Sequence, residues 1–194
     1  MSQLSARMAL RELIAGNNRF VSGHPQHPGQ TRANRHSVAK DQRPSVVVVG
    51  CSDSRVPPTI IFDQGLGFIF EVRTAGHVVD EIAMGSIEYA VVHLGTQLIL
   101  VLGHTGCGVV TLAFKGQKPK GNLATIAEAL MDLPDEVKDV TGDRLGAAVE
   151  VNVRNVMEHL SIEEPITSNL VSRNRVIVAG AVYDMVTGQV RFLK

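Results

Sequence analysis

The chain has 194 residues, of which 44% are hydrophobic, so its length and composition favour one compact domain with a substantial core. Its 19 basic residues balance its 19 acidic ones, and this balance excludes the strongly basic surface typical of nucleic-acid-binding proteins. Every apolar run is shorter than the roughly 18 residues that a membrane helix needs. The N-terminal segment also lacks the apolar stretch of a signal peptide, so we expect a cytoplasmic protein that binds neither nucleic acid nor membrane.

The first expected element is a helix over residues 4–15, because apolar side chains recur there at helical spacing and Gly16 then marks a stop. Residues 22–37 are polar and show no period, which predicts an extended arm or a long loop. The apolar face of the helix needs a partner, which we expect to be another subunit; this face is made of Leu4, Met8, Leu10 and Ile14. The expected organisation is one domain, residues 1–194, divided into a helix and arm, 1–40, and a core, 41–194.

Beyond the arm, short β-branched runs alternate with amphipathic segments, which is typical of parallel α/β folds. Continuous apolar runs such as the one ending at Val49 predict strands that are buried on both faces. We therefore expect an α/β fold, a mainly parallel β-sheet flanked by helices, with an N-terminal helical arm and a C-terminal hairpin extension. The expected strands are 45–49, 68–73, 98–102 and 176–179, the hairpin is 182–193, and the expected helices are 57–62, 80–94, 123–131 and 143–160.

Three potential metal ligands follow two of these buried strands. Cys51 comes after the first strand, and His104 comes after the third, with Cys107 three residues further on. Because ligands bind at the carboxyl ends of strands in open α/β sheets, we expect the three side chains to converge. Cysteine and histidine donors suit tetrahedral zinc, and a cytosolic setting disfavours a disulfide between the two cysteines. Structural zinc sites usually have four such ligands, so three ligands and one open position favour a catalytic site.

The fourth position is left to water, another histidine or a carboxylate, and Asp53 lies near enough to Cys51 in sequence to reach it. Zinc with two thiolates is formally neutral and a weak Lewis acid, so activation of water needs help from a nearby group. Asp53 can accept a hydrogen bond from that water, and Arg55 can hold the carboxylate ionised through a bidentate pair. The alternative is a surface ion pair, which would contribute little.

Two motifs at these positions together resemble the paired zinc signature of the β-class carbonic anhydrases; they are Cys51-Ser52-Asp53-Ser54-Arg55 and Gly103-His104-Thr105-Gly106-Cys107-Gly108. The resemblance implies that Cys51, His104 and Cys107 bind one Zn²⁺ per chain. It also implies that Asp53 and Arg55 form a catalytic dyad. The implied activity is that of carbonate dehydratase, a lyase that hydrates carbon dioxide reversibly to bicarbonate and a proton by attack of zinc-bound hydroxide.

The same resemblance assigns substrate-binding roles to Gln42, Phe70 and Tyr89, and we add Gly108 to them as part of the second motif. Gln42 would donate a hydrogen bond to substrate, while the two aromatic side chains would line a small apolar pocket completed across a subunit interface. A homodimer or homotetramer is therefore implied. The family also permits two states of Asp53: bound to zinc as a fourth metal ligand, or paired with its arginine so that the metal stays open.

Other functions remain to be weighed against this one. A carbonyl sulfide or carbon disulfide hydrolase on the same scaffold typically has alanine where this chain has Ser54, which disfavours that reading. A catalytically silent zinc- or bicarbonate-binding protein would not need the Asp53–Arg55 pair. A cysteine-nucleophile phosphatase would need more backbone amides between Cys51 and its arginine. His77 is expected to be either a hydrogen-bonded loop residue or a proton shuttle.

Overall fold

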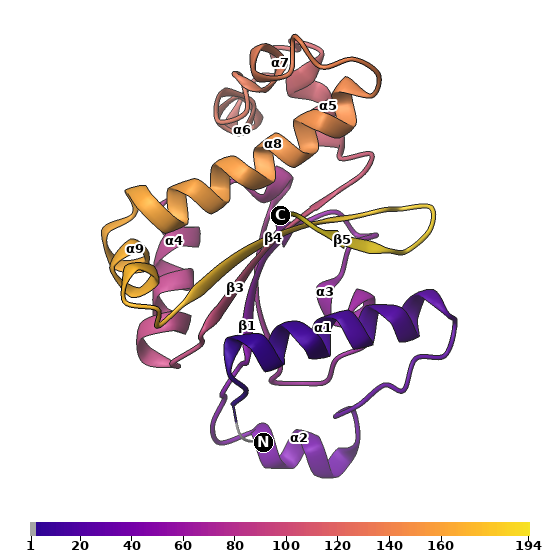
Figure 1. Cartoon of the computed structure of the whole chain (residues 1–194), viewed down its shortest axis with the longest axis vertical. Coiled ribbons are helices and arrows are strands. Elements are labelled where there is room, and N and C mark those ends of the chain that lie inside the picture. The colour runs from indigo at the N-terminus through magenta and orange to yellow at the C-terminus, as the bar shows by residue number, and fades with distance from the viewer. Residues whose placement is uncertain (1–2) are drawn as a thin grey trace.

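A five-stranded sheet forms the centre of the computed structural model, which describes residues 3–194 (Figure 1). The strands are β1 (Val46–Cys51), β2 (Ile69–Thr74), β3 (Leu98–His104), β4 (Ile177–Tyr183) and β5 (Val190–Phe192). Their order is β2-β1-β3-β4-β5, in which β5 alone pairs antiparallel, with β4. The predicted α/β class, parallel sheet and C-terminal hairpin are thereby confirmed. The predicted domain begins with residues 1 and 2, which lie outside the described residues.

Helices cover both faces of this sheet (Figure 1). They are α1 (Ala6–Val21), α2 (Arg32–Val38), α3 (Pro58–Ile61), α4 (Glu81–Glu88), α5 (Gly108–Phe114), α6 (Asn122–Glu128), α7 (Leu133–Glu136), α8 (Arg144–Glu158) and α9 (Pro165–Ser172). A wide, π-helical turn, Tyr89–His93, prolongs α4, and a second π-helical turn, His159–Glu163, prolongs α8. Within residues 3–194, no helix is long and apolar enough to cross a membrane.

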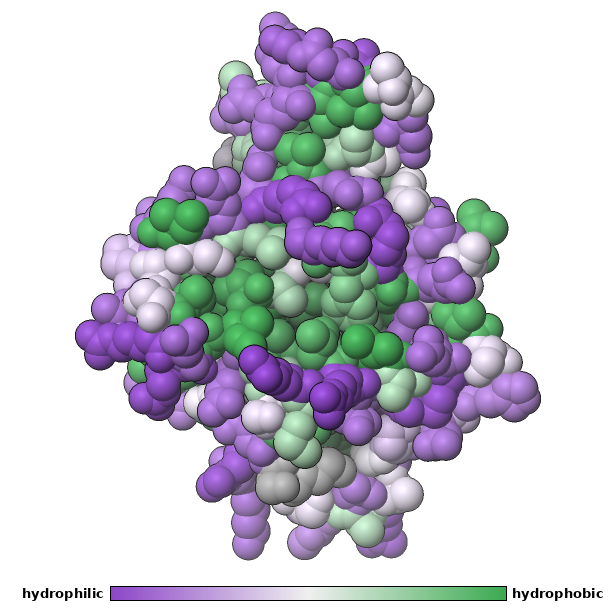
Figure 2. All heavy atoms as spheres, viewed as in Figure 1, coloured by the Kyte–Doolittle hydropathy of each residue, from purple (hydrophilic) through white to green (hydrophobic). Residues whose placement is uncertain are grey.

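The valines of β1 show why the central strands of this sheet are apolar at successive positions. Val46 and Val48 are buried in the core on one face, and Val47 and Val49 are buried in the core on the other. A parallel strand that is covered on both faces has no solvent-facing side, so its sequence reads as a continuous apolar run. Figure 2 shows that hydrophobic surface remains between α8 and α1, over β4 and β5.

The N-terminal helix differs from its prediction in length and in packing. It continues past Gly16 to Val21, so the predicted stop is wrong. A Cβ added at Gly16 would overlap the carbonyl oxygen of Phe62, so this glycine permits a close approach to the chain after α3. The predicted apolar face is divided: Leu4 and Leu10 pack against the chain's own core, whereas Met8 and Ile14 are exposed.

The predicted extended arm is also partly wrong, because residues 32–38 form the helix α2. Its start is capped locally, since the Thr31 hydroxyl accepts a hydrogen bond from the Asn34 N–H at 3.2 Å. None of the described residues of α2 is buried, so the helix leaves no apolar period in the sequence. Three short helices, α5, α7 and α9, were not predicted either.

An ion pair joins α1 to the turn that follows α3. Arg19 Nε donates to Asp63 Oδ2 at 2.6 Å, and the Asp63 side chain is only 1% exposed. The N–H groups of Gln26 and His27 donate to the same carboxylate at 2.9 Å each. Burial raises the pKa of Asp63, but these hydrogen bonds outweigh burial and leave the pKa below its usual value. The ionised carboxylate therefore holds the arm against the core.

The substitution Asp63→Asn should lower the free energy of unfolding at pH 7 by about 1.5–3 kcal/mol, the range for hydrogen bonds to charged groups. Because folding depresses the pKa of Asp63, its contribution is full above the pKa of the unfolded chain, roughly 4. The contribution disappears as the pH falls through the pKa of the folded state. Urea unfolding between pH 7 and pH 3 measures this convergence of variant and wild type. The matched control is Asp41→Asn, in an exposed pair with Arg43, which should change stability by less than about 0.5 kcal/mol.

Candidate metal centre

The ends of β1 and β3 bring the three predicted metal ligands together. Cys51 is the last residue of β1 and His104 is the last residue of β3, and these parallel strands are neighbours. Gly106, with a φ of 67°, then turns the chain so that Cys107 directly precedes α5. The ligand atoms of the three side chains lie within 4.8 Å of one another, and all three residues are buried. The predicted convergence is therefore observed.

The imidazole of His104 is oriented as a metal ligand would be. Its Nδ1 lies 3.0 Å from the carbonyl oxygen of Thr105, and a carbonyl can only accept, so Nδ1 carries the proton. Its Nε2 is therefore left with a lone pair, and this buried atom has no hydrogen-bond partner within residues 3–194. An unpaired buried acceptor is costly, and a cation beside the two cysteine sulfurs would satisfy it.

The two sulfur atoms are prepared to carry negative charge. The N–H groups of Asp53 and Gly76 each donate to Cys51 Sγ at 3.4 Å. The neighbouring Cys107 thiol holds the pKa of Cys51 well below its usual range, and Cys51 in turn raises the pKa of Cys107. Binding of a divalent cation would release protons from the cysteines, because the thiolate is the form that binds metal. Two sulfurs and one imidazole nitrogen are a donor set that fits Zn²⁺.

Asp53 and Arg55 form a bidentate pair beside this centre. Arg55 Nε donates to Asp53 Oδ1 at 2.9 Å and Nη2 donates to Oδ2 at 2.7 Å, while the Arg55 N–H donates to Oδ1 at 2.9 Å. The hydrogen bond from the Arg55 side chain holds the pKa of Asp53 well below its usual range. Asp53 is not in the group of three ligands and faces Arg55, so its binding to the metal stays a prediction.

A second arginine, Arg73, was missed by sequence reasoning. It lies in β2 one position before Thr74, which pairs with Cys51 across the sheet. Its Nε donates to the Cys51 carbonyl at 2.9 Å, and its Nη2 donates to the Asp53 carbonyl at 2.7 Å. Arg73 therefore fixes the backbone that carries a ligand and the carboxylate. The sequence signal that could have identified Arg73 is its position at the carboxyl end of a strand predicted to lie in the same sheet, where functional residues gather.

The predicted substrate-binding residues do not all lie at this centre in a single chain. Gln42 is exposed and precedes β1, whereas Cys51 is the last residue of β1. Because a strand rises roughly 3.3 Å per residue, the whole length of β1 separates the two residues. Phe70 pairs with Val47, near the start of the sheet, and its ring centroid lies 6.3 Å from that of Tyr89. The two aromatic residues thus lie together, but at the other end of the strands.

Gly108 and His77 lie near the metal ligands. Gly108 is the exposed first residue of α5, next to Cys107, and a Cβ there would meet open space. His77 is 1% exposed, and its Nε2 lies 3.0 Å from the amide nitrogen of Asn152. Burial lowers the pKa of His77 to about 4, so the ring stays neutral near pH 7. The expectation of a hydrogen-bonded residue is confirmed, and an enclosed neutral ring does not favour the proton-shuttle alternative.

Comparison with known proteins agrees with this geometry. The family model described as carbonic anhydrase matches residues 46–190. Carbonic anhydrase 2 of Mycobacterium tuberculosis is 40% identical over 188 residues, which cover 93% of this chain and 89% of that protein. A carbonic anhydrase of Mycolicibacterium smegmatis is 51% identical over 124 residues, covering 62% of this chain and 60% of the relative. A solved structure of a tetrameric β-carbonic anhydrase from Sordaria macrospora superposes with a TM-score of 0.77 at 25% identity, covering 96% of this chain and 97% of that one.

These matches show that the chain belongs to the carbonic anhydrase family, and the shared fold and site identify it as a bacterial member of the β class. Zinc is accordingly the metal that the site fits, with Cys51, His104 and Cys107 as the residues that would hold it.

Replacement of Cys107 by serine should abolish stoichiometric zinc binding, because a hydroxyl is a poor substitute for a thiolate. Carbon dioxide hydration should be lost with the metal, and thermal stability should fall because zinc binding contributes folding free energy. Metal analysis of the purified protein measures the first effect. The control Ser52→Ala, at an exposed neighbour of Cys51, should keep one zinc per chain. Full zinc occupancy in Cys107→Ser would contradict the assignment.

Proposed function

We propose that this chain catalyses the reversible hydration of carbon dioxide to bicarbonate and a proton at the Cys51–His104–Cys107 centre. The observation that carries the proposal is a buried Cys₂His donor set with an unpaired His104 Nε2, beside an ionised carboxylate held by Arg55. The family match supports the same activity and does not favour the hydrolase or the silent-protein alternative.

The residues around the centre each have a defined task in this reaction. Zinc, when bound, would act as a Lewis acid that makes water nucleophilic near neutral pH. Asp53 is held ionised by Arg55, so it can accept a hydrogen bond and orient the attacking water. Arg73 fixes the carbonyl groups of Cys51 and Asp53, which keeps carboxylate and metal ligand in a constant relation. Orientation of this kind lowers the entropic part of the barrier.

The substitution Arg55→Ala should lower kcat/KM for carbon dioxide hydration by about 10- to 100-fold while zinc content stays at one per chain, as expected for an outer-shell partner. Stopped-flow assays with a pH indicator measure the rate. The matched control is Arg43→Ala, which removes an exposed arginine paired with Asp41 and should leave the rate unchanged. Faster turnover of carbonyl sulfide than of carbon dioxide by the wild-type zinc form would overturn the proposed reaction.

We further propose that a second copy of the chain completes the substrate pocket. Strand β2 is at the edge of the sheet, and within residues 3–194 its outer side pairs with no strand. Helix α4, which packs beside it, and the wide turn that prolongs α4 carry three exposed apolar side chains, Ile82, Tyr89 and Val92, which are 80%, 47% and 52% exposed. Ile82 and Tyr89, seven residues apart, lie two α-helical turns from each other on one face, and Val92 follows within the same turn as Tyr89. Such a face beside an open edge fits a subunit interface.

Symmetry explains how this interface would bring the scattered residues to the metal. A two-fold axis that lies beside β2 and runs perpendicular to it makes the strands of the two copies run in opposite directions. The carboxyl ends of the strands in one copy then lie beside the strand starts of the other, where Gln42 and Phe70 are found. The solved relative from Sordaria macrospora is tetrameric, which supports assembly of this chain as a dimer or tetramer.

Co-expression of two defective variants tests this arrangement. Asp53→Asn disables the metal side of a site, and Gln42→Ala weakens the substrate side. If Gln42 serves the partner's metal, half of a random mixture are mixed dimers with one intact site each, so about one quarter of wild-type activity returns. If Gln42 serves its own chain, no mixed dimer has an intact site. Activity no greater than the sum of the two separate variants would therefore contradict the proposal.

A further inference from the structure

A strained turn after β2 supplies one of the hydrogen bonds to the metal ligand Cys51. Gly76 has a φ of 67° and His77 a φ of 47°, so two consecutive residues adopt the left-handed conformation. This turn aims the Gly76 N–H at Cys51 Sγ, 3.4 Å away. Histidine adopts this conformation rarely, and strain of this kind persists only where the surroundings enforce it. Some neighbouring group must therefore hold the turn.

Two side chains hold the turn: Thr74 Oγ1 donates to the Val78 carbonyl across it, and Asn152, in the middle of α8, binds it from a distant part of the chain. Its side-chain amide donates to the Gly76 carbonyl at 3.0 Å and contacts His77 Nε2 at 3.0 Å. Because the amide nitrogen can only donate, Nε2 must accept, and the proton of the neutral ring lies on Nδ1. His77 Nδ1 is buried and has no partner within residues 3–194. The tautomer of His77 is thus set by Asn152.

Helix α8 is itself seated firmly on the strand that carries another metal ligand. A Cβ added at Gly103 would lie 2.6 Å from Cγ2 of Val153 and 3.2 Å from Cγ1 of Val149. The helix therefore rests on the bare backbone of β3 at the residue before His104. This contact fixes Asn152 relative to both β1 and β3, because the two strands are paired.

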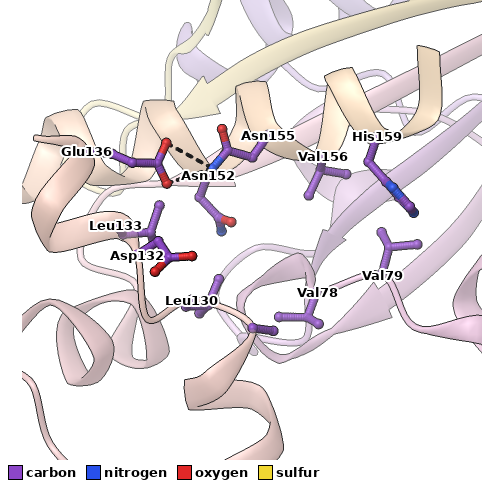
Figure 3. Close-up of a pocket in the computed structure, with 11 residues that line it drawn as sticks. Val78, Val79, Leu130, Asp132, Leu133, Glu136, Asn152, Asn155, Val156 and His159 are labelled. Atoms are coloured by element: carbon purple, nitrogen blue, oxygen red, sulfur yellow. Dashed lines mark hydrogen bonds between the residues drawn. The ribbon is translucent and has the colours of Figure 1, made fainter. Parts of the chain in front are cut away.

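Two asparagines of α8, one turn apart, have different surroundings (Figure 3). Both line a cavity of about 260 Å³ between α8 and the segment 129–136. Asn155 is directed to Glu136, to whose carboxylate oxygens it donates at 3.0 and 3.2 Å. Asn152 is 4% exposed and donates to the turn behind Cys51. The pair thus provides a residue to test and a matched control on one helix.

We propose that Asn152 is a positioning residue for the metal centre: it holds the Gly76–His77 turn so that the Gly76 N–H stays bonded to the Cys51 sulfur. A centre with two thiolates and one imidazole is formally neutral with Zn²⁺. Hydrogen bonds to a thiolate withdraw charge from it, which leaves the metal a stronger Lewis acid and orients the ligand. The inference rests on the metal site of the proposed function, but it concerns metal retention and ligand electronics.

The test compares Asn152→Leu with Asn155→Leu. Leucine keeps the branching of asparagine at Cγ and removes the amide. Zinc release to an excess of chelator should become about 10- to 100-fold faster in Asn152→Leu, the effect typical of an outer-shell partner. In the cobalt-substituted protein, the thiolate-to-cobalt charge-transfer band should shift. Asn155→Leu should change neither quantity. Both readouts report the metal site without carbon dioxide turnover, so they succeed or fail independently of the proposed activity.

Wild-type protein provides a measurement that needs no variant. Long-range ¹H–¹⁵N spectra of the zinc form should show His77 protonated on Nδ1 and unprotonated on Nε2, as donation by Asn152 requires. Protonation on Nε2 would overturn the proposal, even if Asn152→Leu failed to fold. A stable Asn152→Leu protein with wild-type zinc release and an unshifted cobalt band would overturn it as well, because Asn152 would then serve only the packing of α8.

Discussion

The parallel pairing of β1 with β3 is the constraint on which the site depends. Cys51 and His104 end adjacent strands of the same direction, so their side chains leave the sheet at the same edge. The strands are buried on both faces, so close packing from both sides holds them in place. The metal centre therefore inherits its geometry from the core of the protein, and a flexible loop need not hold it.

The surroundings of the ligands compensate for a weakness in the donor set. Two thiolates neutralise the charge of a zinc ion, so its power to activate water depends on what surrounds the sulfurs and the water. Backbone N–H groups of Asp53 and Gly76 donate to Cys51, and Arg55 keeps a carboxylate ionised beside it. Arg73 of β2 and Asn152 of α8 in turn donate hydrogen bonds to the backbone that carries these groups.

The sequence predicts the elements whose signals are local and misses those that depend on distant contacts. Buried strands and the Cys/His motif were predictable, because β-branched runs and ligand types are visible in short windows. Gly16 was misread, since a glycine that permits close packing looks the same as one that ends a helix. Arg73 and Asn152 were missed because their partners lie about 20 and 75 residues away in the chain, and only the folded sheet brings them together.

The seating of α8 on the sheet has a consequence for how this protein can diverge or be redesigned. Val153 lies over Gly103 of β3 and also over Gly180 of β4, where an added Cβ would come within 2.8 Å of Cγ1. At Gly180 the added Cβ would also overlap Sδ of Met157, so a larger residue at either glycine requires Val153 to become smaller and, at Gly180, Met157 to move as well. Larger residues at the two glycines should therefore be accepted together with changes in α8, and libraries that vary one position at a time would miss such combinations.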